Sequence, residues 1–509
     1  IMLQIHLKMA LRLLQKQKAY AFINLTGLVI GMTAVFLITL WVKDELSYDR
    51  SVPNAERVFR LESNTIAPDK TTMHLAEVGW PVGKILQRDY PEVEKLTYLR
   101  RWHPLLKYKG SYIYEEALMA DENFLSVLGY ELASGNPQRA LKEPFSLVIS
   151  QAMEEKYFGK GNGMGKTLMI SDTLPHRVTG VFRELPSHSH LQFDMVRSLS
   201  TMCALYPQDC EYEYASGWFD LNVHNYVLLK PRVNAQTFGA KIEHLVARYG
   251  QKTIQETGFN ATLLLRPVRD IYLHSGKPTA GGEIGNIRTV YLFVTVGIFI
   301  LLLACLNFIN LSTARAVERA KEVGIKKVLG SGKNQLVRQF LTEAAVLCAG
   351  AASISLVAAA IALPLFNQFT GKAFFVGDLI STDNLSLLAV ILLVLIPLTG
   401  FYPAWMLSNY QPITVLKGNF SHSNQGILLR KSLVVIQFAI SVCLIISTLV
   451  VWQQVSFMQN QPLGFDKDQV VLVDAGEVPF RIRQQKASAF KKDLNSQSLI
   501  GLGRAIRLR

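Results

Sequence analysis

The chain has 509 residues, 50% of them hydrophobic, and its 53 Lys and Arg against 39 Asp and Glu give a net charge of +14. This length exceeds the usual size of one domain, and the apolar content is typical of a protein with membrane and soluble parts. A basic excess could also mark a nucleic-acid partner, so its placement along the chain decides what it means.

Five stretches of about 20 residues carry no charged side chain, which is the length that a helix needs to cross about 30 Å of hydrocarbon. Because a helix in a soluble protein buries only one face, five such runs exclude a purely soluble protein. The sequence therefore predicts an integral membrane α-helical protein with about five transmembrane helices. The stretches are 22–42, 290–311, 344–365, 385–407 and 432–452.

The basic residues gather in alternate segments between these spans. The first 21 residues, the segment 312–343 and the loop 408–431 are rich in Lys and Arg, whereas the loop 366–384 holds one Lys and two Asp. By the positive-inside rule, the basic segments are cytoplasmic and residues 43–289 lie outside. We therefore expect a multi-pass protein of the bacterial inner membrane with a cytoplasmic N-terminus. Its basic excess then reflects topology and contact with membrane lipid, with no nucleic-acid partner.

The segment 43–289 is too long for a loop and has the composition of a folded domain. Short runs rich in β-formers alternate with amphipathic stretches and turn signals. We predict a large α+β extracytoplasmic domain, built of one subdomain or two. Cys203 and Cys210 lie in it and could form a disulfide in an oxidising compartment, although spacing alone leaves their pairing open.

Gly27 and Gly31 form a G-x-x-x-G pair within the first span. The absent side chains would let another helix approach this face closely, so we predict a helix-packing role. Glycine is common in membrane helices, and chance presence is the alternative.

The sequence lacks a catalytic pattern. It contains no G-x-S-x-G or H-E-x-x-H motif, and the P-loop-like run that begins at Gly161 has Lys160 where the motif needs its first glycine. His188 and His190 could share a metal, but no further ligands follow at a useful spacing, so we interpret them as ordinary polar surface. We predict no enzyme, no cofactor and no metal site in this chain.

The segment 318–330, Glu-Arg-Ala-Lys-Glu-Val-Gly-Ile-Lys-Lys-Val-Leu-Gly, follows the second span. One interpretation is an amphipathic helix held at the membrane surface by its cations. Its apolar residues are interleaved with glycines, which is a poor design for a lipid-facing helix. A short helix broken by glycines and presenting apolar and charged groups suits docking to a protein partner.

This segment, with Gln339-Phe-Leu-Thr-Glu343 after it, resembles the signature region of the MacB/FtsX-type ABC transporter permeases. Further similar runs occur in the same order along nearly the whole chain. They are Tyr157-Phe-Gly, Gly165-Lys-Thr-Leu, Ser189-His-Leu-Gln-Phe-Asp, Asp270-Ile-Tyr-Leu-His-Ser, Gly285-Asn-Ile, Asn307-Phe-Ile-Asn-Leu, Phe401-Tyr-Pro-Ala and Arg430-Lys-Ser-Leu-Val-Val-Ile-Gln-Phe.

The resemblance implies a permease subunit without chemistry of its own, driven by a separate ABC ATPase subunit. It implies export or extraction of a lipoprotein, peptide or antibiotic-type substrate, a dimer of permease halves, and a periplasmic or outer-membrane partner. An alternative from another class is a membrane-anchored receptor or scaffold that regulates an outside partner, such as a cell-wall hydrolase, without transport. By carry-over, the residues that touch the ATPase would be Glu318, Arg319, Glu322, Gly324, Lys326, Lys327 and Gly330.

The resemblance also implies a domain order, with one departure. Longer family members have two complete halves, whereas here a second anchor span is followed by only about 60 residues. We therefore expect a truncated or frame-shifted form of a longer permease. The expected segments are 1–21 (basic, cytoplasmic), 22–42 (span), 43–289 (MacB-like periplasmic domain), 290–408 (FtsX-like domain with a coupling segment at 314–335), 409–431 (cytoplasmic loop), 432–452 (span) and 453–509 (start of a second outer domain).

Overall fold

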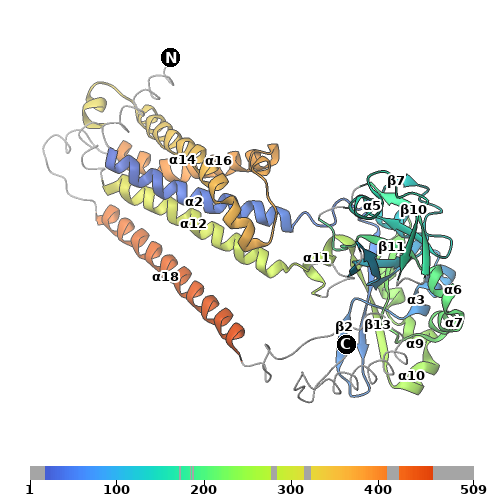
Figure 1. Cartoon of the computed structure of the whole chain (residues 1–509). Coiled ribbons are helices and arrows are strands. Elements are labelled where there is room, and N and C mark those ends of the chain that lie inside the picture. Colours follow the sequence, from blue (N-terminus) through green and yellow to red (C-terminus); the bar gives the residue numbers. More distant parts are fainter. Residues whose placement is uncertain are drawn as a thin grey trace, which may run out of the picture. The chain divides into compact units, whose positions relative to one another are not determined.

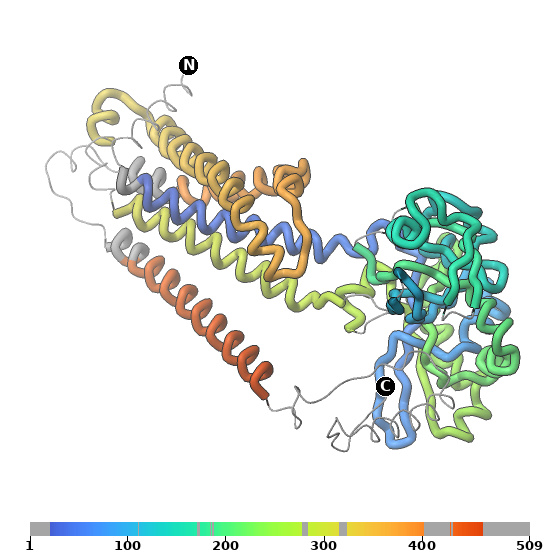
Figure 2. The backbone as a smooth tube through the Cα atoms, viewed as in Figure 1, coloured from blue at the N-terminus to red at the C-terminus, as the bar shows by residue number. Residues whose placement is uncertain are grey.

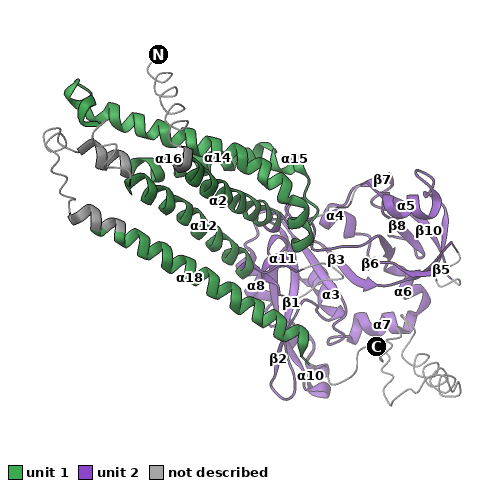
Figure 3. Cartoon of the chain, turned by 60° about the vertical axis from the view of Figure 1, so that its left-hand side comes forward, with its two compact units in different colours: residues 1–44, 288–462 green, residues 45–287, 463–509 purple. Residues whose placement is uncertain are grey.

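The structure is a computed structural model, and it describes residues 18–109, 111–170, 174–183, 185, 188–276, 284–314, 323–409 and 424–461. The chain forms two compact units (Figure 3). Unit 1 comprises residues 1–44 and 288–462, and unit 2 comprises residues 45–287 and 463–509. Within the described residues, the chain thus passes between the units at 44/45 and at 287/288.

Unit 1 is helical, and five of its helices are long and apolar enough to cross a membrane. Each of the five charge-free stretches lies inside one of them. The helices are longer than the apolar runs because polar residues continue them at both ends, as where α14 begins at Lys333 rather than at 344. The helices are α2 (Lys18–Glu45), α12 (Ile287–Ala314), α14 (Lys333–Thr370), α16 (Thr382–Asn409), α18 (Asn424–Asn460) and the short α15 (Val376–Leu379) (Figure 1).

Residues of α2, α12, α14 and α16 form one apolar core, and α14 and α16 run side by side (Figure 2). Both glycines of the G-x-x-x-G pair face α12. A Cβ on Gly31 would lie 3.0 Å from the Cβ of Ala304, and one on Gly27 would lie 3.1 Å from Nδ2 of Asn307. Helix α18 differs, because no residue of its most apolar stretch is buried within the chain, whereas 39% of the corresponding stretch of α2 is buried.

Unit 2 contains one mixed sheet with the strand order β13-β1-β12-β3-β6-β11-β8-β10-β9-β4-β5, with β2 added beside β1 and β7 beside β10. Only the pairs β6/β11 and β8/β10 are parallel among the described strands. The strands are β1 (Val58–Ile66), β2 (Thr72–Leu75), β3 (Val93–Trp102), β4 (Leu105–Tyr108), β5 (Ser111–Tyr114), β6 (Ala117–Ala120), β7 (Leu132–Gly135), β8 (Ser146–Ile149), β9 (Thr167–Ile170), β10 (Leu174–Phe182), β11 (Met195–Ser198), β12 (His224–Leu229) and β13 (Asn260–Pro267).

Helices cover both faces of this sheet. Because successive strand residues point to opposite faces, Val227 joins one core and Leu228 the other. The first core contains residues of α3, α5, α6, α7, α8 and α9, and the second contains residues of α4, η1 and α11. The helices are α3 (Trp80–Asp89), α4 (Phe124–Leu128), α5 (Gln151–Phe158), α6 (Ser200–Leu205), α7 (Pro207–Ser216), α8 (Ala235–Ile242), α9 (Leu245–Tyr249), α10 (Gln251–Thr257), η1 (Val268–Asp270) and α11 (Ile271–His274).

Candidate functional sites

The described part of the predicted coupling segment is a short helix at 323–328, between α12 and α14. Nζ of Lys326 donates a hydrogen bond to Oε1 of Gln339, 3.0 Å away, and Nε2 of Gln339 donates to Glu343. The segment is therefore tied to the first turns of α14. Gly330 ends the helix with a φ of +93°, a conformation that suits glycine.

The outward side of this segment is apolar. Ile325, Val328 and Leu329 have 53%, 64% and 79% of their surface exposed, and we call these three residues the coupling patch. Neighbouring exposed apolar side chains on a short loop are unusual on a soluble surface. Such a cluster favours a contact with protein or membrane.

The predicted contact residues fall in different places. Gly324 is buried inside the helix and does not break it. Lys326 and Lys327 are half-buried. Burial lowers the pKa of Lys327, and the positive charge of Lys333 lowers that pKa further. Glu318, Arg319 and Glu322 lie outside the described residues. The sequence shows the apolar residues among the charges, but not that they face outward.

A second cluster lies in unit 2, around the carboxylate of Glu62 on β1. Its Oε1 accepts from Nη2 of Arg60 at 2.5 Å and from Oγ of Ser275 at 3.3 Å. Its Oε2 accepts from Arg266 at 3.2 Å and lies 3.0 Å from Nε2 of His74. Burial raises the pKa of Glu62, but Arg60 and Arg266 together hold that pKa below its usual value. The carboxylate stays ionised and joins β1, β2, β13 and the chain after α11.

A second buried carboxylate, Asp49, forms the other end of this cluster. Its Oδ1 accepts from the backbone N–H of His190 at 3.0 Å and from Nδ1 of the same residue at 2.7 Å. Nε2 of His190 lies 2.7 Å from the hydroxyl of Tyr226 on β12, which also hydrogen-bonds to Arg60. His190 is only 2% exposed, so its interpretation as polar surface was wrong. It is buried because Asp49 and Tyr226 satisfy both of its ring nitrogens.

Aromatic rings join the two ends of unit 2's chain, which we call the inbound segment (residues 45–50) and the outbound segment (residues 268–276). Tyr48 of the first stacks on Tyr272 of the second with ring centroids 3.5 Å apart and planes 7° apart, and the hydroxyl of Tyr272 donates to Glu45 at 2.9 Å. These rings lie on the same two chain segments as Asp49 and Ser275, and we call the rings and the two carboxylate clusters together the buried network. It comprises Glu45, Tyr48, Asp49, Arg60, Glu62, His190, Tyr226, Tyr272 and Ser275.

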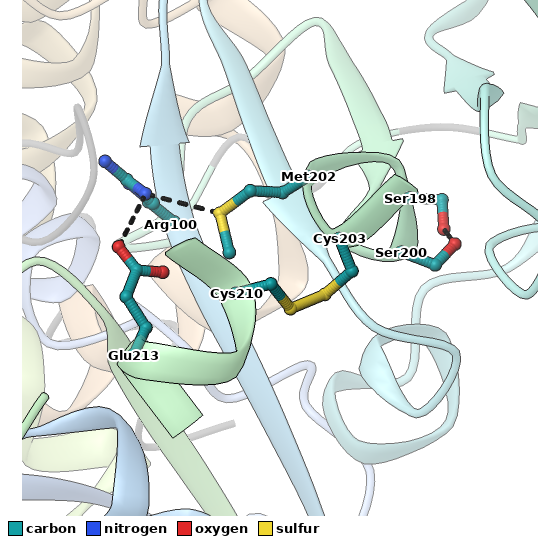
Figure 4. Close-up of a disulfide and its surroundings, with 7 residues drawn as sticks. All are labelled: Arg100, Ser198, Ser200, Met202, Cys203, Cys210 and Glu213. Carbon is teal, nitrogen blue, oxygen red and sulfur yellow. Dashed lines mark hydrogen bonds and ion pairs between the residues drawn. A yellow bond between two sulfur atoms is a disulfide. The ribbon is translucent and has the colours of Figure 1, made fainter. Parts of the chain in front are cut away.

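Cys203 and Cys210 are joined by a disulfide that links α6 to α7 (Figure 4). On the same α7, Glu213 lies 3.8 Å from Nη1 of Arg100, whose guanidinium also contacts the sulfur of Met202. The disulfide therefore staples two short helices over one face of the sheet. Among the described residues, no group of three or more His, Cys, Asp or Glu could hold a metal.

Comparison with known families gives one matching family model mainly in unit 2 and another in unit 1. The model of the MacB-like periplasmic core domain matches residues 21–245, and that of the FtsX-like permease C-terminal region matches residues 294–412. The chain belongs to the MacB/FtsX-type family of ABC transporter permeases. This membership and the apolar helices make it a bacterial inner-membrane protein with a MacB-like domain inserted between its first two spans.

Individual relatives are distant. The "Macrolide export ATP-binding/permease protein MacB" of Burkholderia cenocepacia is 22% identical over 438 residues, covering 80% of this chain and 57% of that protein. The "Probable export ATP-binding/permease protein" of Pseudomonas fluorescens is 24% identical over 409 residues, covering 77% of this chain and 57% of that protein. The chain thus spans little more than half the length of these relatives. The periplasmic region of MacB from Actinobacillus actinomycetemcomitans is 15% identical, covering 45% of this chain and 95% of that structure with a TM-score of 0.32.

Proposed function

We propose that this chain is the permease subunit of an ABC transporter, and that a separate ATPase subunit docks on the coupling patch. The single observation that carries the proposal is the outward exposure of Ile325, Val328 and Leu329 in a loop between two membrane-spanning helices. Exposed apolar side chains next to lysines in the chain suit a small interface core with a polar rim. The ties from Lys326 to α14 would pass movement of the docked ATPase into the bundle.

The orientation belongs to the same proposal. The basic residues around the coupling patch favour the cytoplasmic side, where ATP is available, and α14 carries the chain to the opposite side. Unit 2 is then periplasmic. The cysteine of a Val328→Cys variant would stay protected from a membrane-impermeant maleimide in intact cells, whereas that of Ile380→Cys, in the loop after α14, would react.

The cycle that we propose is mechanical. ATP hydrolysis on the partner moves the spans, and the spans move unit 2, so that the chain itself catalyses no reaction. The work done is export or extraction of a lipoprotein, peptide or antibiotic-type substrate by two permease halves acting together, with a periplasmic or outer-membrane partner receiving it. The family membership and the relatives named for export support this cycle.

The test is affinity purification of the tagged full chain from detergent-solubilised membranes, with mass spectrometry of the proteins that accompany it. We expect an ABC-type ATPase with the unmodified chain, and at least a tenfold lower yield with the double variant Val328→Asp/Leu329→Asp. Ile380→Asp is the matched control, because Ile380 is an equally exposed apolar loop residue, 61% exposed, at the other end of α14.

Equal ATPase recovery with the double variant would refute docking on the coupling patch. Recovery of an outside partner without any ATPase would replace the permease proposal by a receptor or scaffold. Membrane insertion of each variant is checked by carbonate extraction, so that a loss of ATPase is not mistaken for a loss of protein.

A further inference from the structure

The buried network holds together the two places where the chain enters and leaves unit 2. The inbound segment contributes Asp49 and Tyr48, and the outbound segment contributes Ser275 and Tyr272. In the chain, these segments directly follow α2 and closely precede α12. Inside unit 1, the same two helices pack along the glycine pair, and Trp41 lies 4.8 Å from Phe293 between ring centroids.

Charge makes this connection stiff. Asp49, Arg60 and Glu62 are all 0% exposed, and Glu62 accepts from a group on its own strand and from groups on three other segments. Ionised groups away from water interact far more strongly than surface pairs, and pulling one from its partners leaves an uncompensated buried charge. A small displacement of one segment against the sheet is therefore costly.

The network is also continuous. Arg60 connects the Glu62 hub to Tyr226, Tyr226 connects to His190, and His190 donates to Asp49. Tyr226 lies on β12, which pairs with β1 on one side and β3 on the other. The two chain ends are thus tied to each other and to central strands of the sheet, not only to an edge.

We propose that Glu62, Arg60 and Asp49 are positioning residues of the transport cycle: they lock the inbound and outbound segments to the sheet, so that unit 2 follows the spans as one body. The inference rests on the proposed function, since it needs an ATPase to drive the spans. It goes further by naming the side chains that carry the motion into unit 2.

The decisive variant is Arg60→Met/Glu62→Met, which removes both charges and keeps side chains of similar volume. An apolar pair of similar size can replace a buried ion pair without loss of stability, so this variant should still fold. Of the partners left behind, Arg266 and His74 are 28% and 32% exposed in their side chains and can be hydrated, whereas the hydroxyl of Ser275 is buried and loses both Arg60 and Glu62. Glu62→Gln is the milder second variant. Lys156→Met/Glu115→Gln is the matched control, since it breaks a close ion pair of unit 2 that involves neither chain segment.

The readout is amide hydrogen exchange of the ATPase-bound full chain, with and without ATP and vanadate. In the unmodified complex we expect exchange in 45–50 and 268–276 to stay slow and unchanged, while ATP alters exchange in the coupling segment at least fivefold. In the Met/Met variant the two unit 2 segments should exchange at least fivefold faster on ATP addition only, with the ATPase rate within twofold of normal. The control should behave like the unmodified chain.

A merely structural role would speed exchange equally with and without ATP, and that result would overturn the inference. Slow exchange in both states of the Met/Met and Gln variants would overturn it as well. Failure of the proposed function looks different, because no ATPase would then co-purify with the unmodified chain.

Discussion

The coupling patch and the buried network place their charged and apolar groups in opposite ways. In the coupling patch, apolar side chains face outward while Lys326 turns to Gln339. In the buried network, carboxylates and a guanidinium lie fully inside a folded unit. The difference teaches that exposed apolar groups favour the docking of a partner proposed above, whereas the charges of the buried network find most of their partners within unit 2 itself. Substitutions should therefore affect binding in one place and stability in the other.

The largest effect is expected from Arg60→Ala. Glu62 would keep a buried charge without its closest partner, which typically costs about 3–5 kcal/mol of stability. The measurement is urea unfolding of the full chain in detergent, followed by proteolysis of unit 2. Arg60→Met/Glu62→Met should stay within about 1 kcal/mol of the unmodified chain, in contrast to the single variant. Equal losses in both would mean that packing, not charge, holds this region.

Acidification should weaken unit 2 and leave the coupling patch unaffected. Burial lowers the pKa of His224 from 6.5 to about 3, and that of His176 to about 4. The unfolded chain therefore binds more protons below pH 6.5, so stability is full above that pH and falls as the pH drops toward these values. Between pH 7 and 5 we expect a loss of about 2 kcal/mol for each histidine. His224→Asn should remove about half of the slope, and a flat profile would contradict the assignment.

Opening the disulfide should cost less. A cross-link that closes a loop of seven residues restricts the unfolded chain by about 2.5 kcal/mol in the chain-entropy model. Cys203→Ser should lower the stability of unit 2 by that order, as should reductant added to the unmodified chain. Reductant should have no further effect on the variant, and an additional effect would show that the two sulfurs are not paired.

A smaller effect is expected where α2 meets α12. A methyl group at Gly31 would lie 3.0 Å from Ala304 Cβ, so Gly31→Ala must push the helices apart, at about 1 kcal/mol. Gly350→Ala is the control in another span, since its new Cβ would come no closer than 4.0 Å to Leu25. The measurement is thermal unfolding of both variants in the same detergent. Equal shifts would argue against close packing along this seam.

The two regions are not equally predictable from the sequence. Five spans and a large inserted domain follow from charge-free runs, because a membrane demands a length and composition that few other environments do. The family resemblance locates the coupling segment. Which of its faces points outward depends on packing against α14, so the sequence alone does not show that Gly324 is buried and that Lys326 is half-buried and hydrogen-bonds to Gln339.

The buried network could not be predicted from local patterns. Arg60 and Glu62 sit in a strand whose alternation suggests one exposed face, yet both are covered, because strands on both sides and the outbound segment enclose them. The hydrogen-bond partner of His190, Asp49, is separated from it by 141 residues in the sequence. The runs that contain His190 and Ser275 are among those that resemble the family. Both residues belong to the buried network, and this shared structural role is a physical reason for the resemblance.

The most direct test of the permease account is photo-crosslinking in living cells from a benzoylphenylalanine placed at position 329, with position 380 as the reference. The account predicts that irradiation joins position 329 to an ABC ATPase and that position 380 gives no such product. A crosslink from 329 only to lipid, or an ATPase adduct from 380 instead, would contradict it.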